Sequence, residues 1–187
     1  LIKEVSFGND GNISQEKLED CINSDLANNY GNLCQRVTAF AIKNCESKIP
    51  EKIEFQKDDL DILDKYNNNL ENIRSKIDKQ DINFYIDFII NSLFEANKYF
   101  NDQEPWKKKD DIVRLNTIVY TTLEIVRKIS FLLFPIIPHS SLKALKIFNL
   151  NEKDIVFTSI GNNDFLTKGN SINKIEILFN KIEKDND

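Results

Sequence analysis

Apolar residues recur every three or four positions over most of the chain, which is the period of an amphipathic α-helix. The first series begins after Ser14, whose hydroxyl suits a helix N-cap, and runs to about Asn44. Asn29, Asn32 and Arg36 occupy a neighbouring stripe, and the last two, four residues apart, project from one face. The apolar positions of this helix are Leu18, Ile22, Leu26, Tyr30, Leu33, Val37 and Phe40.

Three further series predict long helices. The second covers residues 57–77, the third is capped by Asp81 and ends at Asn101-Asp102, and the fourth opens at Asp110-Asp111. The fourth is apolar on nearly all sides, which predicts a place at the centre of a helical bundle. The apolar sets are Leu60, Ile62, Leu63, Tyr66, Leu70 and Ile73; Ile82, Tyr85, Ile89, Leu93, Ala96 and Phe100; and Leu115, Ile118, Val119, Leu123, Val126, Ile129 and Leu133.

The two ends of the chain are less regular. Pro135 and Pro138 end the fourth helix, and His139-Ser140-Ser141 can start a short one over residues 142–148. We interpret residues 154–160 as extended. We expect Ile175, Ile177, Leu178 and Ile182 to pack onto the bundle. Before the first helix, residues 1–7 read as an extended lead and residues 8–11 as a turn, and the abrupt apolar start suggests a piece of a longer protein.

Composition supports this picture and limits the functions. Only 5 Gly and 4 Pro among 187 residues favour long helices over many short strands. The formal net charge of −5 argues against non-specific coating of DNA, because such binding needs a broadly basic surface. Any affinity for nucleic acid must therefore come from a local basic patch or from a larger protein.

Cysteine and hydropathy patterns indicate a cytoplasmic protein. Cys21, Cys34 and Cys45 are odd in number, form no Cys-x-x-Cys pair and lie far from His139, so we expect reduced thiols and neither disulfides nor a zinc site. The longest apolar run, residues 129–138, is shorter than the ~20 residues that cross a bilayer. We expect no membrane partner and no secretion signal.

Catalytic patterns are missing from this sequence. It has one His, no phosphate-binding Gly-rich loop and no credible Ser/His or Cys/His pair. Paired acids at Asp58-Asp59 and Asp110-Asp111 stand at helix starts, where the helix dipole accounts for them. We expect no catalytic residue, no metal and no cofactor in this chain.

The segment around the single tryptophan is the strongest functional signal. Trp106 follows Pro105 and precedes Lys107, Lys108 and Lys109 in a loop between two helices. An exposed ring can stack on an unpaired base while ammonium groups meet phosphates. The competing interpretation is a loop tryptophan folded onto the bundle, beside lysines that are merely solvated. By composition alone, Asn32 and Arg36 would likewise be an ordinary solvated helix face.

Several segments together resemble the anticodon-binding domain of methionyl-tRNA synthetase. Residues 25–36, DLANNYGNLCQR, are similar to its first helix, with Asp-Leu-Ala-Asn, then Gly-Asn-Leu, then Arg. Residues 96–99, ANKY, and 104–106, EPW, resemble its second signature. Residues 7–11, FGNDG, match the stretch that leads in from the catalytic half, and residues 178–183, LFNKIE, resemble its closing segment.

The resemblance implies an all-α helical bundle of the class I synthetase type and assigns residue roles. Asn32 and Arg36 would hydrogen-bond to anticodon bases, Trp106 would stack on the first base of CAU, and Pro105 would hold the loop. Residues 1–13 would link to an upstream catalytic half, residues 14–150 would form the bundle, and residues 151–187 would be a tail packed back on it.

Further expected site residues are Asn97 and Tyr99, whose motif is partly structural, and Lys107, which would contact phosphate. The partners implied are methionine tRNA, through its anticodon loop, and the catalytic domain of the same chain, in a monomeric enzyme. ATP and methionine would bind that catalytic domain, so this piece alone should be inactive and bind RNA weakly.

The chain departs from the family pattern at two positions and leaves two rivals open. Val37 follows Arg36 where many relatives carry Asn, and Asn180 replaces a proline in the closing segment. The His-rich nucleotide motif and the Lys-Met-Ser-Lys-Ser loop of class I synthetases are absent. The rivals are the equivalent domain of a leucyl, isoleucyl, valyl or cysteinyl synthetase, and a helical protein-interaction module with Trp106 as its anchor.

Overall fold

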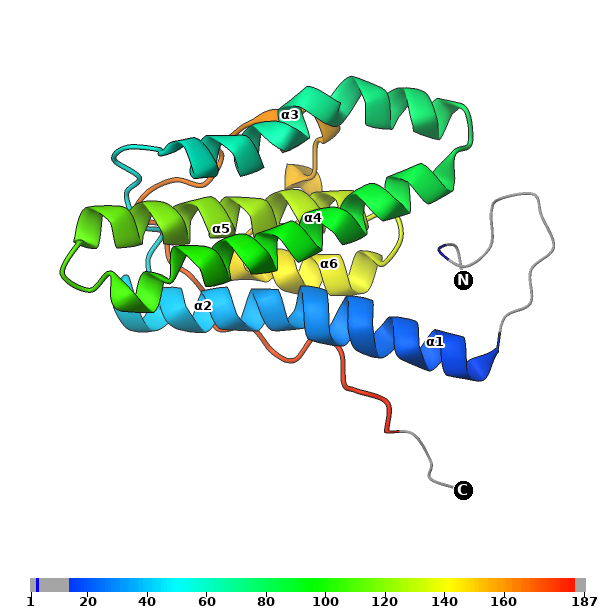
Figure 1. The fold of residues 1–187 in the computed structure, drawn as a ribbon, viewed down its shortest axis with the longest axis horizontal. Coiled ribbons are helices and arrows are strands. Elements are labelled where there is room, and N and C mark those ends of the chain that lie inside the picture. Colours follow the sequence, from blue (N-terminus) through cyan, green and yellow to red (C-terminus); the bar gives the residue numbers. More distant parts are fainter. Residues whose placement is uncertain (1–2, 4–13, 184–187) are drawn as a thin grey trace.

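The first predicted helix is one continuous rod in the computed structural model, which describes residue 3 and residues 14–183. It consists of α1 (Gln15–Cys21), the π-helical η1 (Ile22–Gly31) and α2 (Asn32–Asn44), seen as the blue rod in Figure 1. Ser14 caps it as predicted, its Oγ accepting from the Lys17 amide at 3.2 Å. The predicted lead and turn lie outside the described residues, except for Lys3.

The π-helical stretch was not predicted, and it lies directly before the candidate RNA-binding residues. The Asn32 amide donates to the carbonyl of Ala27, five residues back, which is the bonding pattern of a π-helix. A Cβ on Gly31 would lie 3.2 Å from the carbonyl oxygen of Leu26 and 3.6 Å from the Phe179 ring. Glycine therefore avoids a close contact with the Leu26 carbonyl, while the 3.6 Å to Phe179 would be an ordinary contact for any residue.

The long helices α3 (Lys57–Asp78), α4 (Ile82–Gln103) and α5 (Ile112–Leu133) confirm the predicted series within two residues at each end. Asp81 and Asp111 cap α4 and α5, accepting from the amides of Phe84 and Arg114. One core prediction was wrong, since Leu60 is 40% exposed on the outer face of α3.

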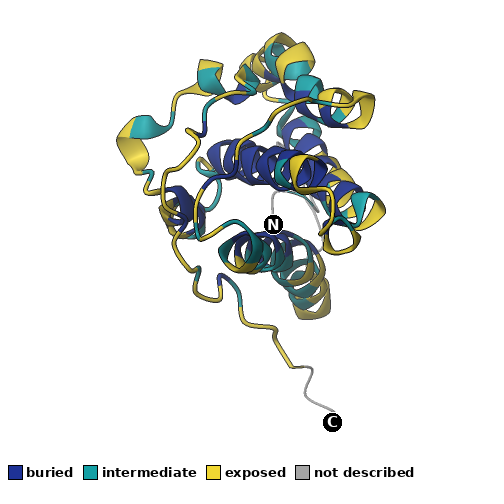
Figure 2. Cartoon of the chain, turned by 90° about the vertical axis from the view of Figure 1, so that its left-hand side faces the viewer, coloured by how far each residue is buried: buried dark blue, intermediate teal, exposed yellow. Residues whose placement is uncertain are grey.

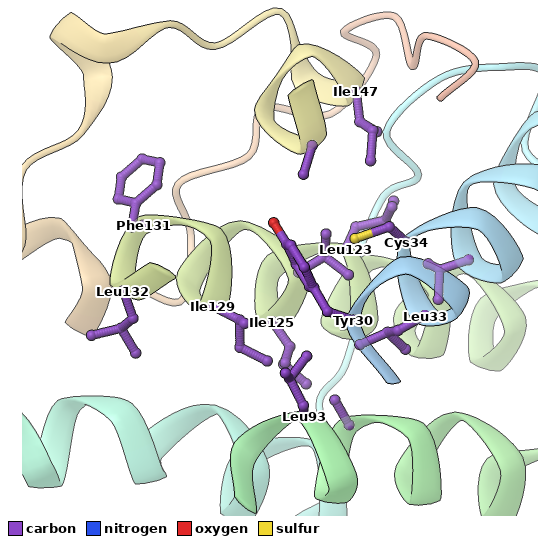
Figure 3. Close-up of a cluster of buried hydrophobic side chains, with 14 of the residues drawn as sticks. Tyr30, Leu33, Cys34, Leu93, Leu123, Ile125, Ile129, Phe131, Leu132 and Ile147 are labelled. Carbon is purple, nitrogen blue, oxygen red and sulfur yellow. The ribbon is translucent and has the colours of Figure 1, made fainter. Parts of the chain in front are cut away.

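Helix α5 is at the centre of the bundle, as its apolar sequence predicts. Nearly all of it is dark blue in Figure 2, and every residue from Thr117 to Leu133 is buried. Tyr30 of η1 points into the core beside Leu33 and Cys34 (Figure 3), and its hydroxyl lies 2.7 Å from Ser130 Oγ on α5. The first helix is thus bonded directly to the central one.

The short predicted helix is also present, with a shifted start. It appears as α6 (Pro138–Leu145) followed by the 3-10 turn η3 (Lys146–Phe148). Pro138 occupies the first helical turn, where its missing amide hydrogen is harmless. His139 is therefore an ordinary helical residue, as expected.

The prediction of an extended segment over residues 154–160 was wrong. The chain forms the 3-10 turns η4 (Glu152–Asp154) and η5 (Phe157–Gly161) there. Hydrogen bonds from two buried basic side chains of α5 account for the compact path. Arg127 donates to the carbonyls of Ser159 and Asn162 at 3.2 and 2.9 Å, and Lys128 Nζ donates to those of Ile160 and Asn162 at 2.5 and 2.9 Å.

The last described residues follow the bundle surface, and half of the predicted apolar contacts form. Ile175 and Leu178 pack against the core, whereas Ile177 and Ile182 are 63% and 37% exposed, contrary to expectation. Asn23 holds the tail through two hydrogen bonds with the backbone of Ile182, at 2.8 and 2.9 Å.

The three thiols are free, and their surroundings predict an order of reactivity. Burial raises the pKa of Cys34 far above its usual value and that of Cys45 to about 11, and it raises the pKa of Cys21 to a smaller extent. Because the thiolate is the reactive form, a disulfide reagent at pH 8 should modify Cys21 first and Cys34 only after unfolding. Mass spectrometry of a labelling time course would check this, and early labelling of Cys34 would contradict the buried position of this thiol.

Among the helices that the structure describes, none is both long and apolar enough to span a bilayer.

Candidate nucleic-acid interface

The loop that carries Trp106 is a short ordered turn between α4 and α5, at the left end of the bundle in Figure 1. Glu104 ends α4 in the left-handed conformation, with φ 44° and ψ 57°, and so redirects the chain. The 3-10 turn η2 (Pro105–Lys107) follows, and the Lys107 amide donates to the Glu104 carbonyl at 2.9 Å. The loop thus holds the tryptophan through its own backbone hydrogen bonds.

Trp106 lies against the bundle on one side and faces solvent on the other. Its ring centroid is 6.0 Å from that of Phe100 with an interplanar angle of 72°, an edge-to-face contact. The residue remains 38% exposed. The ring is therefore packed on the bundle and still has surface free for a ligand, and the stacking role stays a prediction.

Arg36 reaches the same aromatic ring from α2. Its guanidinium carbon lies 5.6 Å from the Phe100 ring centroid, and one of its terminal nitrogens donates to Asn101 Oδ1 at 2.6 Å. Arg36 and Trp106 therefore both contact the Phe100 ring, although they are 70 residues apart in the sequence. Since a guanidinium has five N–H donors, others stay available.

Asn32 lies one helical turn before Arg36, about 6 Å along the axis of α2. It is half-buried, and its side chain forms no hydrogen bond with the part of the chain that the structure describes. The structure thus brings Arg36 and Trp106 together on Phe100, with Asn32 one helical turn before Arg36 on α2.

Asn97 and Tyr99 face inwards from α4. Asn97 Nδ2 donates to Asn29 Oδ1 at 2.6 Å and so joins α4 to η1. Tyr99 is 7% exposed, and its hydroxyl donates to Asp59 of α3. Burial and the charge of Asp59 raise the pKa of Tyr99 well above its usual value, so the hydroxyl remains a donor at neutral pH. Both side chains therefore join α4 to neighbouring elements of the bundle.

A buried ion pair fixes the end of α4, and the sequence did not reveal it. Arg114 of α5 donates to both carboxylate oxygens of Asp59, at 2.5 and 3.0 Å, and to Gln103 Oε1 at 2.5 Å. Asp59 also accepts from the Gln56 amide at 2.8 Å. The helix dipole alone is thus an incomplete explanation for this acid, whose carboxylate links α3, α4 and α5 next to the Trp106 loop.

Charges near the loop differ on its two sides. Lys107 pairs with Glu104 at 2.7 Å, while Lys108 and Lys109 follow it on the way to α5. Between α3 and α4, a groove of about 430 Å³ is lined by Asp58, Asp61, Glu95 and Asp102 together with Lys98. Asp102 pairs with Lys98 and Glu95 with Lys65. The groove is therefore acidic on balance, whereas the loop beside it carries three lysines.

No cluster of His, Cys, Asp and Glu suited to a metal ion occurs among residue 3 and residues 14–183.

Known proteins are similar to this chain over most of its length. Residues 49–187 match the family described as the anticodon-binding domain of methionyl tRNA ligase. Methionine–tRNA ligase of Mycobacterium leprae is 38% identical over 86% of this chain and 31% of its own length. That of Rickettsia felis is 36% identical over 99% of this chain and 37% of its own length.

Solved structures show the same fold. The free form of Mycobacterium tuberculosis methionyl-tRNA synthetase superposes with a TM-score of 0.91 and 32% identity, over 98% of this chain and 38% of that one. Its complex with methionyl-adenylate gives a TM-score of 0.89 over 95% of this chain and 36% of that one. The chain thus spans about a third of the length of its curated relatives. It belongs to the methionyl-tRNA ligase family, as an all-α anticodon-binding domain.

Proposed function

We propose that this domain selects methionine tRNA by binding the CAU anticodon within a methionine–tRNA ligase. The observation that carries the proposal is the convergence of Arg36 and Trp106 on Phe100, with Asn32 one turn away. Segments from two distant parts of the sequence supply hydrogen-bonding groups and a stacking surface at one exposed place. Unpaired bases are recognised by that combination.

Each residue has a distinct task in this proposal. The exposed side of Trp106 stacks on the first anticodon base, which contributes about 1–3 kcal/mol. Asn32 and the free donors of Arg36 hydrogen-bond to the Watson–Crick edges of the bases. Pro105, which is buried at the start of η2, shapes the turn that presents the ring.

Lys108 and Lys109 supply phosphate contacts in an otherwise acidic domain, and Lys107 contributes once its pair with Glu104 opens. Changing Lys108 and Lys109 to Ala should weaken binding of CAU and scrambled stem-loops by the same factor. It should also reduce the slope of log K against log salt concentration by about 1.4, at ~0.7 per phosphate contact on a single strand. Titrations from 50 to 200 mM salt would measure this slope. An unchanged slope would remove these lysines from the interface.

The parent enzyme, in this proposal, attaches methionine to its tRNA with ATP, as a cytoplasmic monomer. ATP and methionine bind its catalytic domain, which is joined to this one in the same chain. The domain alone is then expected to show no aminoacylation and only weak affinity for RNA, because the net charge of −5 provides little general attraction.

The direct test is a fluorescence titration, since Trp106 is the single tryptophan of the 187-residue chain. An anticodon stem-loop with CAU should quench its emission at lower concentration than one with a scrambled loop. Equal quenching by the two loops would contradict anticodon recognition. No response to either RNA would favour a protein-binding role for the exposed ring. The family match already favours the methionyl enzyme over the leucyl, isoleucyl, valyl and cysteinyl ones.

A further inference from the structure

We infer that Phe100 is a positioning residue that couples Arg36 to Trp106, so that the two act on the RNA as one unit. The inference rests on the proposed function and assigns a task to a residue that its sequence pattern marks as ordinary core. Phe100 is 2% exposed and cannot itself touch a base. Any effect it has on recognition must therefore pass through the residues on its ring.

Three contacts from two neighbouring elements hold that ring. Phe40 of α2 packs edge-to-face on it, with centroids 5.9 Å apart and an interplanar angle of 84°. Arg36 lies one helical turn before Phe40, and its guanidinium is 5.6 Å from the same centroid. Two side chains of α2, one helical turn apart, therefore contact the Phe100 ring.

The third contact connects the Phe100 ring to the loop that holds Trp106. The Trp106 ring is edge-to-face with Phe100 at 6.0 Å. A change in the Phe100 ring thus alters the orientation of the guanidinium and the indole together. Because both groups are held before RNA arrives, less ordering is needed on binding, which favours affinity. Asn101, the next residue of α4, holds the guanidinium in the same place by its hydrogen bond.

The coupling predicts a specific non-additivity. Phe100→Leu keeps an apolar side chain but removes the flat ring, so it should weaken binding of the CAU stem-loop about 5- to 10-fold. If Trp106→Ala costs about 30-fold in the unaltered protein, it should cost only about 5-fold when Phe100→Leu is already present. The preference for CAU over a scrambled loop should fall in the single variant too.

The experiment is a double-mutant cycle on the full-length enzyme, with calorimetric Kd values for both stem-loops and a thermal melt of each variant. Phe88→Leu is the matched control, because Phe88 lies on the same helix, is 9% exposed and makes an edge-to-face contact of 6.0 Å with Tyr66. It should lower Tm to a similar extent and leave the cost of Trp106→Ala unchanged.

The outcomes separate this inference from the proposed function. If the unaltered enzyme does not prefer CAU, the proposed function fails. If it does, but the effects of Phe100→Leu and Trp106→Ala simply multiply, Phe100 is only a core residue and the coupling is overturned. Should Phe100→Leu not fold, Phe40→Leu loosens the same ring from α2, and the same reduced cost of Trp106→Ala is expected. Multiplying effects there would overturn the coupling equally.

Discussion

Replacing Asp59 with Asn is expected to lower the free energy of unfolding by about 3–5 kcal/mol, the usual cost of breaking a buried ion pair. The Asp59 side chain is fully buried, and its two oxygens accept hydrogen bonds from Arg114, Tyr99 and the Gln56 amide. An asparagine has nearly the same shape but one acceptor oxygen. Its amide group would face donors, and the guanidinium would lose its counter-charge in a buried place.

Thermal and urea denaturation would measure this effect. For a domain of this size, Tm should fall by about 6–20 °C, at ~2–4 °C per kcal/mol. Asp102→Asn is the matched control, because its pair with Lys98 is exposed and should contribute less than ~1 kcal/mol. A double variant, Asp59→Leu with Arg114→Met, should recover part of the loss, since no unpaired charge remains, while the Tyr99 hydroxyl and the Gln56 amide still lose their acceptor. A Tm loss no larger than that of the control would show that the pair does not hold the bundle.

Replacing Trp106 with Ala is expected to raise the Kd for the CAU stem-loop about 5- to 150-fold, which corresponds to the ~1–3 kcal/mol of stacking on one base. The bundle should stay folded, because the ring is 38% exposed and packs mainly on Phe100. In the full-length enzyme the same change should raise KM for tRNA and leave methionine activation without tRNA unchanged. Trp106→Phe, which retains a smaller ring, should have a Kd between that of the unaltered protein and that of Trp106→Ala.

Phe157→Ala is the control for loss of an exposed aromatic side chain. Phe157 is 37% exposed, close to the value for Trp106, and lies in η5 rather than in the Trp106 loop. It should leave the Kd unchanged. If Trp106→Ala instead lowers Tm by more than ~10 °C and leaves the Kd as it was, the tryptophan is a packing residue and the stacking role is excluded.

The helical bundle could be predicted from the sequence because local patterns determine it. Helix caps at Ser14, Asp81 and Asp111 and three- to four-residue spacing of apolar positions define the long helices. The compact path of residues 157–161 could not be predicted in this way. It depends on Arg127 and Lys128, whose hydrogen bonds to that segment join residues more than 30 positions apart.

The sequence identifies the candidate binding residues, but it does not identify the buried residues that hold them in place. Asn32, Arg36 and Trp106 could be named from residue type, spacing and family resemblance, and their roles stay predictions. Phe100 has the ordinary spacing of a core residue, so only the tertiary contacts with α2 and the loop distinguish it. Asp59 looked like a helix-start acid, and its partner Arg114 is 55 residues away.

The π-helical stretch lets the first helix hold an additional residue without changing the direction in which its two halves face. Each residue of an α-helix turns the chain by about 100°, since 3.6 residues make one turn, whereas a π-helix holds more residues per turn. Deleting one residue from a regular part of α2 would therefore rotate the preceding helix by about 100°. Deleting one from residues 22–29 would instead permit ordinary α-helical bonding and largely keep the orientation of α1 relative to Asn32.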